Sequence, residues 1–206
     1  MNEALGSNIT RTLPALILSC FCSLSTANSF NTYDATPWEI CGLCHGIDGQ
    51  SVMSKFPMLA GQKAVYIERQ LRAFNSGLRM NDGGQMASIS GEIQKDQYPV
   101  VAAYFSNKSP AFSPSAVEST VDQIEQGQQI YEGLGASGKS CASCHSDAEA
   151  NAPWLDMQHF DYLVKQLSDF RTGRRSELKE STPHSVITNT QAEAIAHYAS
   201  SRRIRP

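Results

Sequence analysis

The sequence lacks the features that membrane-spanning, nucleic-acid-binding and β-sheet proteins need. Its apolar runs all fall short of the ~20 residues that cross a bilayer as a helix. Residues 28–110 carry seven acidic and seven basic side chains, so this segment has no excess of positive charge that would favour nucleic-acid binding. No segment alternates apolar and polar residues as a half-buried strand does. These absences predict an all-α fold.

The first 27 residues have the features of an export signal. Arg11 precedes an apolar run, LPALILSCFCSLS, and the segment 25–27 supplies the small residues that a signal peptidase recognises. We therefore predict that residues 1–27 are a cleaved signal peptide and that the protein is periplasmic. The alternative is a lipoprotein anchored at Cys20, which Leu18 fits less well.

Four cysteines remain after the signal, and each pair of them is followed at once by a histidine. The two segments read CGLCH at 41–45 and CASCH at 141–145. C-x-x-C-H is the attachment signature of c-type haem, in which both thiols bond to the porphyrin and the histidine is the proximal iron ligand. The sequence therefore predicts two covalently bound haem c groups, held by Cys41, Cys44 and His45 and by Cys141, Cys144 and His145.

Three other interpretations explain these motifs less well. A structural zinc site has its two C-x-x-C halves ~15–20 residues apart, whereas these lie 100 residues apart. A thioredoxin-like redox pair needs a βαβ context, which the sequence does not provide. Two simple disulfides leave both histidines unexplained.

The two halves of the chain also repeat outside the motifs. Residues 56–79 align with 152–175 at an offset of 96, with proline, leucine, glutamine, tyrosine and arginine at matching positions. Apolar residues fall at helical spacing in both copies, which indicates core packing with the haem edge as part of the core. A stretch rich in Ser and Pro separates the copies. We predict an N-terminal domain at 28–108, a linker at 109–120 and a C-terminal domain at 121–206, each a small helical bundle around one haem.

With these motifs the chain resembles the dihaem cytochrome c4 family, over nearly all of residues 35–203. The resemblance implies two tandem class I cytochrome c domains that relay single electrons between a periplasmic donor and an acceptor such as a terminal oxidase. It implies redox-protein partners, no nucleic-acid partner and no catalysis of the protein's own, and it allows peripheral membrane association through an oxidase partner. The dihaem cytochrome subunit of flavocytochrome c sulfide dehydrogenase is similar, so an obligate dehydrogenase subunit is an alternative function.

The resemblance also implies the ligands of the first haem. It makes His45 the proximal ligand and Pro57 the residue whose carbonyl orients that imidazole. Counting eighteen residues back from Tyr104, the family's spacing, gives Met86 as the distal ligand. Met80 is the rival candidate.

The second haem departs from the family pattern. The same count from Tyr198 gives Glu180, a poor ligand for iron that cycles through the ferrous state, and no methionine follows Met157. The loop is also two residues shorter than in the first half. The candidates for the distal position are His184, Lys179 or no protein ligand. An open site would make the protein a haem enzyme or sensor that binds a small molecule.

Other histidines and arginines have expected roles away from the iron. His159 is expected to be a surface residue or a neighbour of a haem propionate, and His197 lies far from the ligand loop along the chain. The cationic cluster of Arg171, Arg174, Arg175 and Lys179 is expected in part to be a solvated helix end that complements the helix dipole, with docking of an acidic partner or contact with haem propionates as alternatives. Methionine opposite histidine raises a haem's reduction potential. The first haem should therefore have the higher potential, so that electrons enter at the second haem and leave by the first.

Overall fold

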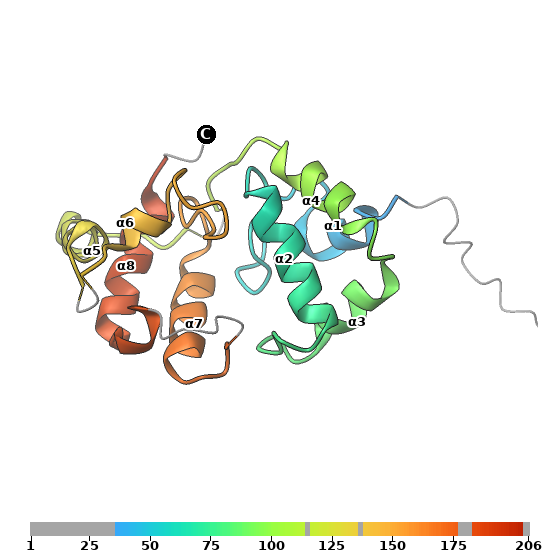
Figure 1. Ribbon diagram of the computed structural model, residues 1–206. Helices are drawn as coiled ribbons and strands as arrows, with labels where there is room; N and C mark the ends of the chain where they lie inside the picture. The colour runs from blue at the N-terminus through green and yellow to red at the C-terminus, as the bar shows by residue number, and fades with distance from the viewer. Residues whose placement is uncertain (1–35, 114–115, 136–137, 177–182, 204–206) are drawn as a thin grey trace, which may run out of the picture. The chain divides into compact units, whose positions relative to one another are not determined.

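The computed structural model describes residues 36–113, 116–135, 138–176 and 183–203 (Figure 1). Within these ranges the chain is helical and contains no strand, which confirms the all-α prediction. The elements are α1 Glu39–His45, α2 Ala64–Asn75, α3 Gln85–Glu92, α4 Tyr98–Ser106, α5 Val121–Glu132, α6 Cys141–Cys144, α7 Phe160–Arg171, the 3-10 helix η1 Pro183–Val186 and α8 Asn189–Ser201. None of the described helices is long and apolar enough to cross a membrane. The predicted signal peptide, 1–27, and Cys20 lie outside the described residues.

Helices α2 and α7 are the two copies of the predicted repeat. Each has twelve residues with apolar side chains at helical spacing; α2 buries Ile67, Leu71 and Phe74, whereas α7 buries Leu163 and packs the partly buried Phe160 and Leu167 against the core of the second half. Gly77 and Gly173 follow them with φ of 73° and 72°, the left-handed conformation in which a side chain is strained. Thr188 begins α8 with the predicted capping box, because its hydroxyl accepts the N–H of Gln191 while the Gln191 side chain accepts the N–H of Thr188.

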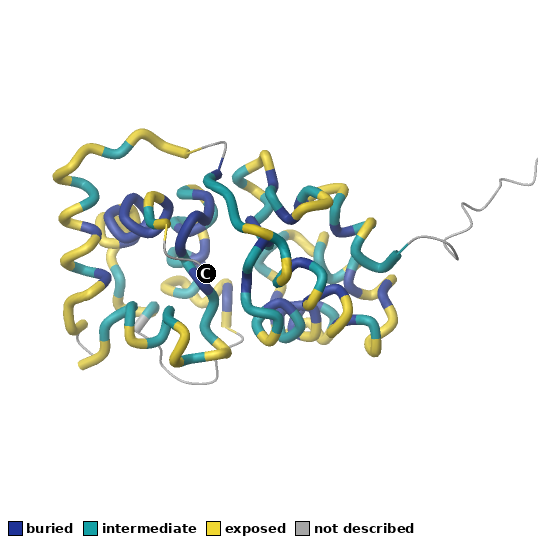
Figure 2. Tube along the Cα trace, turned by 90° about the horizontal axis from the view of Figure 1, so that it is seen from above, coloured by how far each residue is buried: buried dark blue, intermediate teal, exposed yellow. Residues whose placement is uncertain are grey.

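The two halves have separate apolar cores. In the first half, residues 36–113, the core lies between α1, α2 and α4, and Tyr98 and Phe105 are fully buried in it. In the second half, residues 116–203, α5 packs against α8, much of which is buried (Figure 2). The two helices approach so closely at Gly127 that a Cβ there would lie 2.0 Å from the carbonyl oxygen of Ala194. Glycine is therefore required at this crossing.

The halves meet through two glutamines that make the same contacts in opposite directions. The Gln62 amide donates to the carbonyl of Trp154 (2.9 Å) and accepts its N–H (2.9 Å). The Gln158 amide donates to the carbonyl of Met58 (3.0 Å) and accepts its N–H (2.8 Å). The described residues of both halves belong to one compact unit. The division at 28–108, 109–120 and 121–206 stays a prediction.

Two buried arginines extend this reciprocal contact. Each guanidinium donates to a glutamine of its own half and to a tyrosine of the other half. The pairs are Arg79 with Gln70 (2.6 Å) and Tyr162 (3.0 Å), and Arg175 with Gln166 (2.8 Å) and Tyr66 (3.2 Å). The expectation that Arg175 belongs to a solvated helix end is wrong, since it is only 5% exposed. Arg174 is 65% exposed and pairs with Asp169, as a helix-end residue does.

This geometry predicts that the interface glutamines stabilise the fold. Gln62→Ala should lower the free energy of unfolding by about 2–3 kcal/mol, because two buried peptide groups lose their partner. Gln128→Ala is the matched control, since Gln128 is exposed and contacts only the surface carboxylate of Glu132. Denaturant titration of the haem-loaded protein measures the free energy of unfolding of both variants. Equal effects of the two substitutions would contradict the role of the interface.

Candidate haem sites

The first candidate site is built on α1, which carries the first C-x-x-C-H motif. Cys41 is buried and Cys44 exposed on the same helical turn. The Nδ1 of His45 lies 2.9 Å from the carbonyl oxygen of Pro57. A carbonyl only accepts, so Nδ1 carries the proton and Nε2 keeps its lone pair. Burial lowers the pKa of His45 and keeps the imidazole neutral, the state in which it binds a metal.

The second candidate site repeats this arrangement on a shorter helix. Helix α6 begins at Cys141 and ends at Cys144, and His145 follows it directly. The Nδ1 of His145 donates to the carbonyl oxygen of Pro153 at 2.7 Å, which fixes the same tautomer as in the first site. The pKa of His145 is lowered to about 4, chiefly by burial and to a smaller extent by the positive charges of Lys63 and Arg175, while the hydrogen bond to Pro153 acts in the opposite direction.

The thiols themselves argue against a redox-active pair. All four described cysteines are free, so neither pair forms a disulfide. Burial raises the pKa of the Cys41 thiol to about 11, and burial also raises the pKa of Cys141. Thioredoxin-like pairs need a lowered thiol pKa. Two thiols on one turn beside a neutral imidazole match the donor set that holds a c-type haem.

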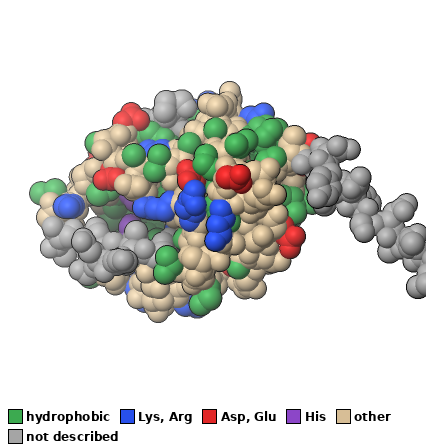
Figure 3. All heavy atoms as spheres, turned by 45° about the vertical axis from the view of Figure 1, so that its right-hand side comes forward, with side chains coloured by type: hydrophobic (Ala, Val, Ile, Leu, Met, Phe, Trp, Pro, Cys, Tyr) green, Lys and Arg blue, Asp and Glu red, His purple; other side chains and the backbone are tan. Residues whose placement is uncertain are grey.

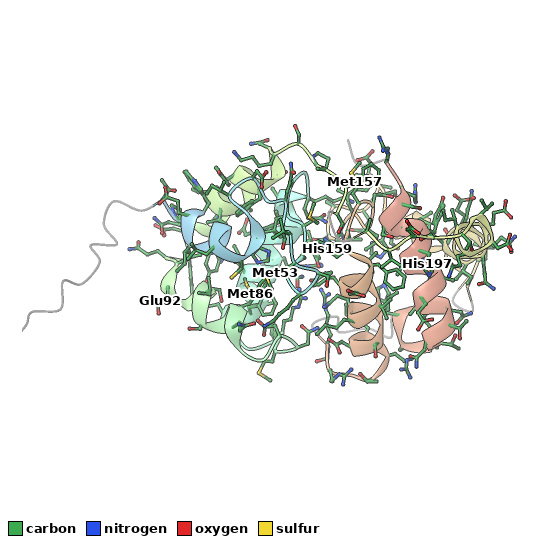
Figure 4. All side chains as sticks on the ribbon, turned by 180° about the vertical axis from the view of Figure 1, so that it is seen from behind. Met53, Met86, Glu92, Met157, His159 and His197 are labelled. Carbon is green, nitrogen blue, oxygen red and sulfur yellow. The ribbon has the colours of Figure 1, made fainter. Side chains whose placement is uncertain are left out.

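Met86 lies on α3, next to the first site (Figure 4). Its side chain is partly buried against the core of the first half, and its N–H donates to the Asp82 carboxylate at 2.5 Å. The rival Met80 is 68% exposed. Met86 is therefore better placed than Met80 to serve as a ligand of a group enclosed by this core.

His184 lies on η1, next to the proximal histidine of the second site. The ring centroids of His145 and His184 are 5.9 Å apart, at an interplanar angle of 61°. Two imidazoles on one metal have centroids roughly 6 Å apart, since each metal–nitrogen bond is about 2 Å and each ring adds about 1 Å. Phe170, at the end of α7, stacks on His184 with centroids 4.8 Å apart. The residues of the second site thus fit a haem with two histidine ligands.

The remaining candidates are less well placed or lie outside the structure. Lys179 and Glu180 fall outside the described residues. His159 precedes α7 and is completely buried, with Nδ1 2.5 Å from the Ser113 hydroxyl, so the expectation of a surface position is wrong (Figure 4). His197, on α8, packs on Phe160 and lies 2.8 Å from the Ser119 hydroxyl.

Sequence reasoning missed two side chains that support the second site. Phe170 belongs to the apolar stripe that the sequence predicts as core and haem edge, but the sequence does not predict its contact with His184. Lys63, from the first half, contacts the backbone that follows His145. The only sequence signal is that Lys63 occupies the repeat position equivalent to His159, so that a cation in one half corresponds to a histidine in the other.

Comparison with known proteins identifies relatives over most of the chain. Cytochrome c4 of Pseudomonas aeruginosa is 34% identical over 146 residues, covering 66% of this chain and 69% of that protein. Cytochrome c4 of Azotobacter vinelandii is 33% identical over 151 residues, covering 66% and 70%. The thiosulfate dehydrogenase electron acceptor of Thiomonas intermedia is 26% identical over 175 residues, covering 81% and 80%.

A solved structure supports the same assignment. The crystal structure of reduced recombinant cytochrome c4 from Pseudomonas stutzeri matches with a TM-score of 0.66 and 26% identity, covering 80% of this chain and 94% of that chain. No protein-family model matches the sequence. The chain belongs to the cytochrome c4 family of dihaem c-type electron-transfer proteins, as its two C-x-x-C-H motifs predicted.

Proposed function

We propose that the protein relays single electrons in the periplasm through two haems that differ in their distal ligands. The observation that carries this proposal is the 5.9 Å spacing of His145 and His184, because the first half has a methionine, Met86, on α3 where the second offers an imidazole. Nitrogen in place of sulfur stabilises ferric iron. The second haem then has the lower potential, and electrons pass from it to the first.

The chain's own residues supply attachment, orientation and ligation. When bound, a c-type haem takes up and releases one electron at its iron. The proline carbonyls hold each proximal imidazole in the tautomer whose Nε2 binds metal. The residues proposed to hold the first haem are Cys41, Cys44, His45 and Met86, and those proposed for the second are Cys141, Cys144, His145 and His184.

The donor is proposed to be a periplasmic dehydrogenase and the acceptor a terminal oxidase or another cytochrome. The relative named as a thiosulfate dehydrogenase electron acceptor supports a dehydrogenase as the donor. It also supports the second candidate function, a subunit of a dehydrogenase complex. The export features of residues 1–27 support the periplasm, with anchoring at Cys20 as the alternative. An open second haem that binds a small molecule is disfavoured, because His184 already faces His145.

Both cysteine pairs should carry covalent haem. The mature protein should contain two haems per chain that acid-acetone does not extract, by pyridine haemochrome assay and mass spectrometry. The double substitution Cys141→Ala and Cys144→Ala should leave one covalent haem per chain. A wild-type protein with a single haem would contradict the dihaem assignment.

Met86 should be the sulfur ligand of the first haem. Met86→Ala should abolish the far-red sulfur-to-iron charge-transfer band of the ferric protein and lower the higher of the two potentials, because methionine favours the reduced state. Met80→Ala is the matched control and should change neither the charge-transfer band nor the potential, since Met80 is exposed. If the band disappears with Met80→Ala instead, the ligand assignment is wrong.

His184 should be the distal ligand of the second haem. His184→Ala should convert only the lower-potential haem to a high-spin form that binds carbon monoxide when reduced. His197→Ala, which removes a histidine packed on Phe160, should leave both haems low-spin. Stoichiometric carbon monoxide binding at one haem of the wild type would show that His184 does not ligate the iron, and would favour the open-site function.

A further inference from the structure

The second site is supported by a cation from the first half. Lys63 immediately precedes α2, and its ammonium donates to the carbonyl oxygens of Ser146 and of Glu149, the latter at 2.7 Å. The same ammonium lies 4.5 Å from the ring centroid of Trp154, a cation–π distance. One side chain thus contacts three points of a short loop.

These contacts lie at the two ends of the loop that follows the proximal imidazole. Ser146 follows His145 directly in the chain, and Trp154 follows Pro153, whose carbonyl accepts the proton of the His145 Nδ1. Lys63 therefore contacts the residue after the ligand and the residue after the carbonyl that orients it. Release of this contact would free both ends of the loop that holds the imidazole.

The ammonium keeps its charge in a partly buried position. Burial lowers the pKa of Lys63, whereas the nearby carboxylates of Asp147 and Glu149 raise it. A buried ammonium is costly unless its hydrogens have acceptors, and here two carbonyls and an aromatic face receive them. The charge lies next to the proximal ligand in the chain, since one of the carbonyls that it contacts belongs to Ser146, which directly follows His145.

The repeat does not reproduce this cation in the other direction. The residue equivalent to Lys63 at the offset of 96 is His159. That imidazole is completely buried and lies 2.5 Å from the Ser113 hydroxyl, and burial lowers its pKa, so it is neutral at pH 7. Of these two equivalent residues, only Lys63 therefore provides a fixed positive charge, and it provides that charge to the second site.

We propose that Lys63 is a positioning residue of the second haem site, which fixes the loop between His145 and Trp154 and raises the reduction potential of the haem bound there. This rests on the proposed attachment of that haem at Cys141 and Cys144. On reduction the ferric iron takes one electron from its donor, and the site loses one positive charge. A fixed cation nearby favours the reduced state.

The test compares substitutions that separate charge from contact. Lys63→Gln removes the charge and keeps a hydrogen-bond donor, whereas Lys63→Arg keeps the charge. Lys63→Gln should shift the one-electron equilibrium of the second haem about threefold toward the oxidised state, a fall of about 28 mV, and leave the first haem unchanged. Lys63→Arg should retain most of the wild-type potential.

The matched control removes the same charge elsewhere. Basic side chains gather on one face of the molecule (Figure 3). Lys95 is an exposed lysine of the first half that lines a pocket with Arg72 and Tyr98. Lys95→Gln should leave both potentials unchanged. Potentiometric titration with dithionite and mediators gives the two potentials, and Met86→Ala identifies which belongs to the first haem.

The positional role has its own measurement. Lys63→Met should speed the hydrogen exchange of the amides in residues 146–152, because both carbonyl contacts are lost. The proposal is overturned if Lys63→Gln shifts both potentials equally, shifts neither, or if exchange in this loop is unchanged in Lys63→Met. A wild-type protein with one haem overturns the proposed function instead, so the two failures are distinguishable by haem content.

Discussion

The hydrogen bond from the proximal histidine to a proline carbonyl is the constraint on which both sites depend. Each imidazole must be neutral and present one particular nitrogen, and a carbonyl partner on Nδ1 achieves both. The chain closes this bond over twelve residues in the first half and over eight in the second. The shorter loop leaves less room for contacts of its own, and it takes Lys63 from the other half as an additional support.

Duplication gave the molecule two equivalent sites, and its function depends on where the copies differ. The reciprocal glutamine contacts with Trp154 and Met58 preserve the equivalence at the interface. The differences lie around the proposed iron positions, where we propose His184 in place of a methionine and where Lys63 corresponds to a buried histidine, His159. Two identical sites would give electron flow no preferred direction, so these substitutions provide the asymmetry that a relay needs.

Sequence reasoning succeeded where the signal is local. The cysteine spacing, the helical spacing of α2 and α7 and the capping box of Thr188 each involve residues within a few positions of one another. It failed for the solvated position of Arg175 and the surface position of His159, which have hydrogen-bond partners in the other half of the chain. A buried polar residue and an exposed one look alike in sequence when the hydrogen-bond partner lies far away along the chain, because no periodic pattern marks a long-range polar contact.

In the proposed function, the potential of the second haem results from two opposing effects. A histidine ligand in place of methionine favours ferric iron and lowers the potential. The charges of Lys63 and Arg175, which both act on His145, favour ferrous iron and raise it. On this proposal the ligand sets the direction of electron flow, and the cations limit the free energy lost in each transfer. Because both cations belong to contacts between the halves, the interface that holds the two sites together would also adjust the difference in potential between them.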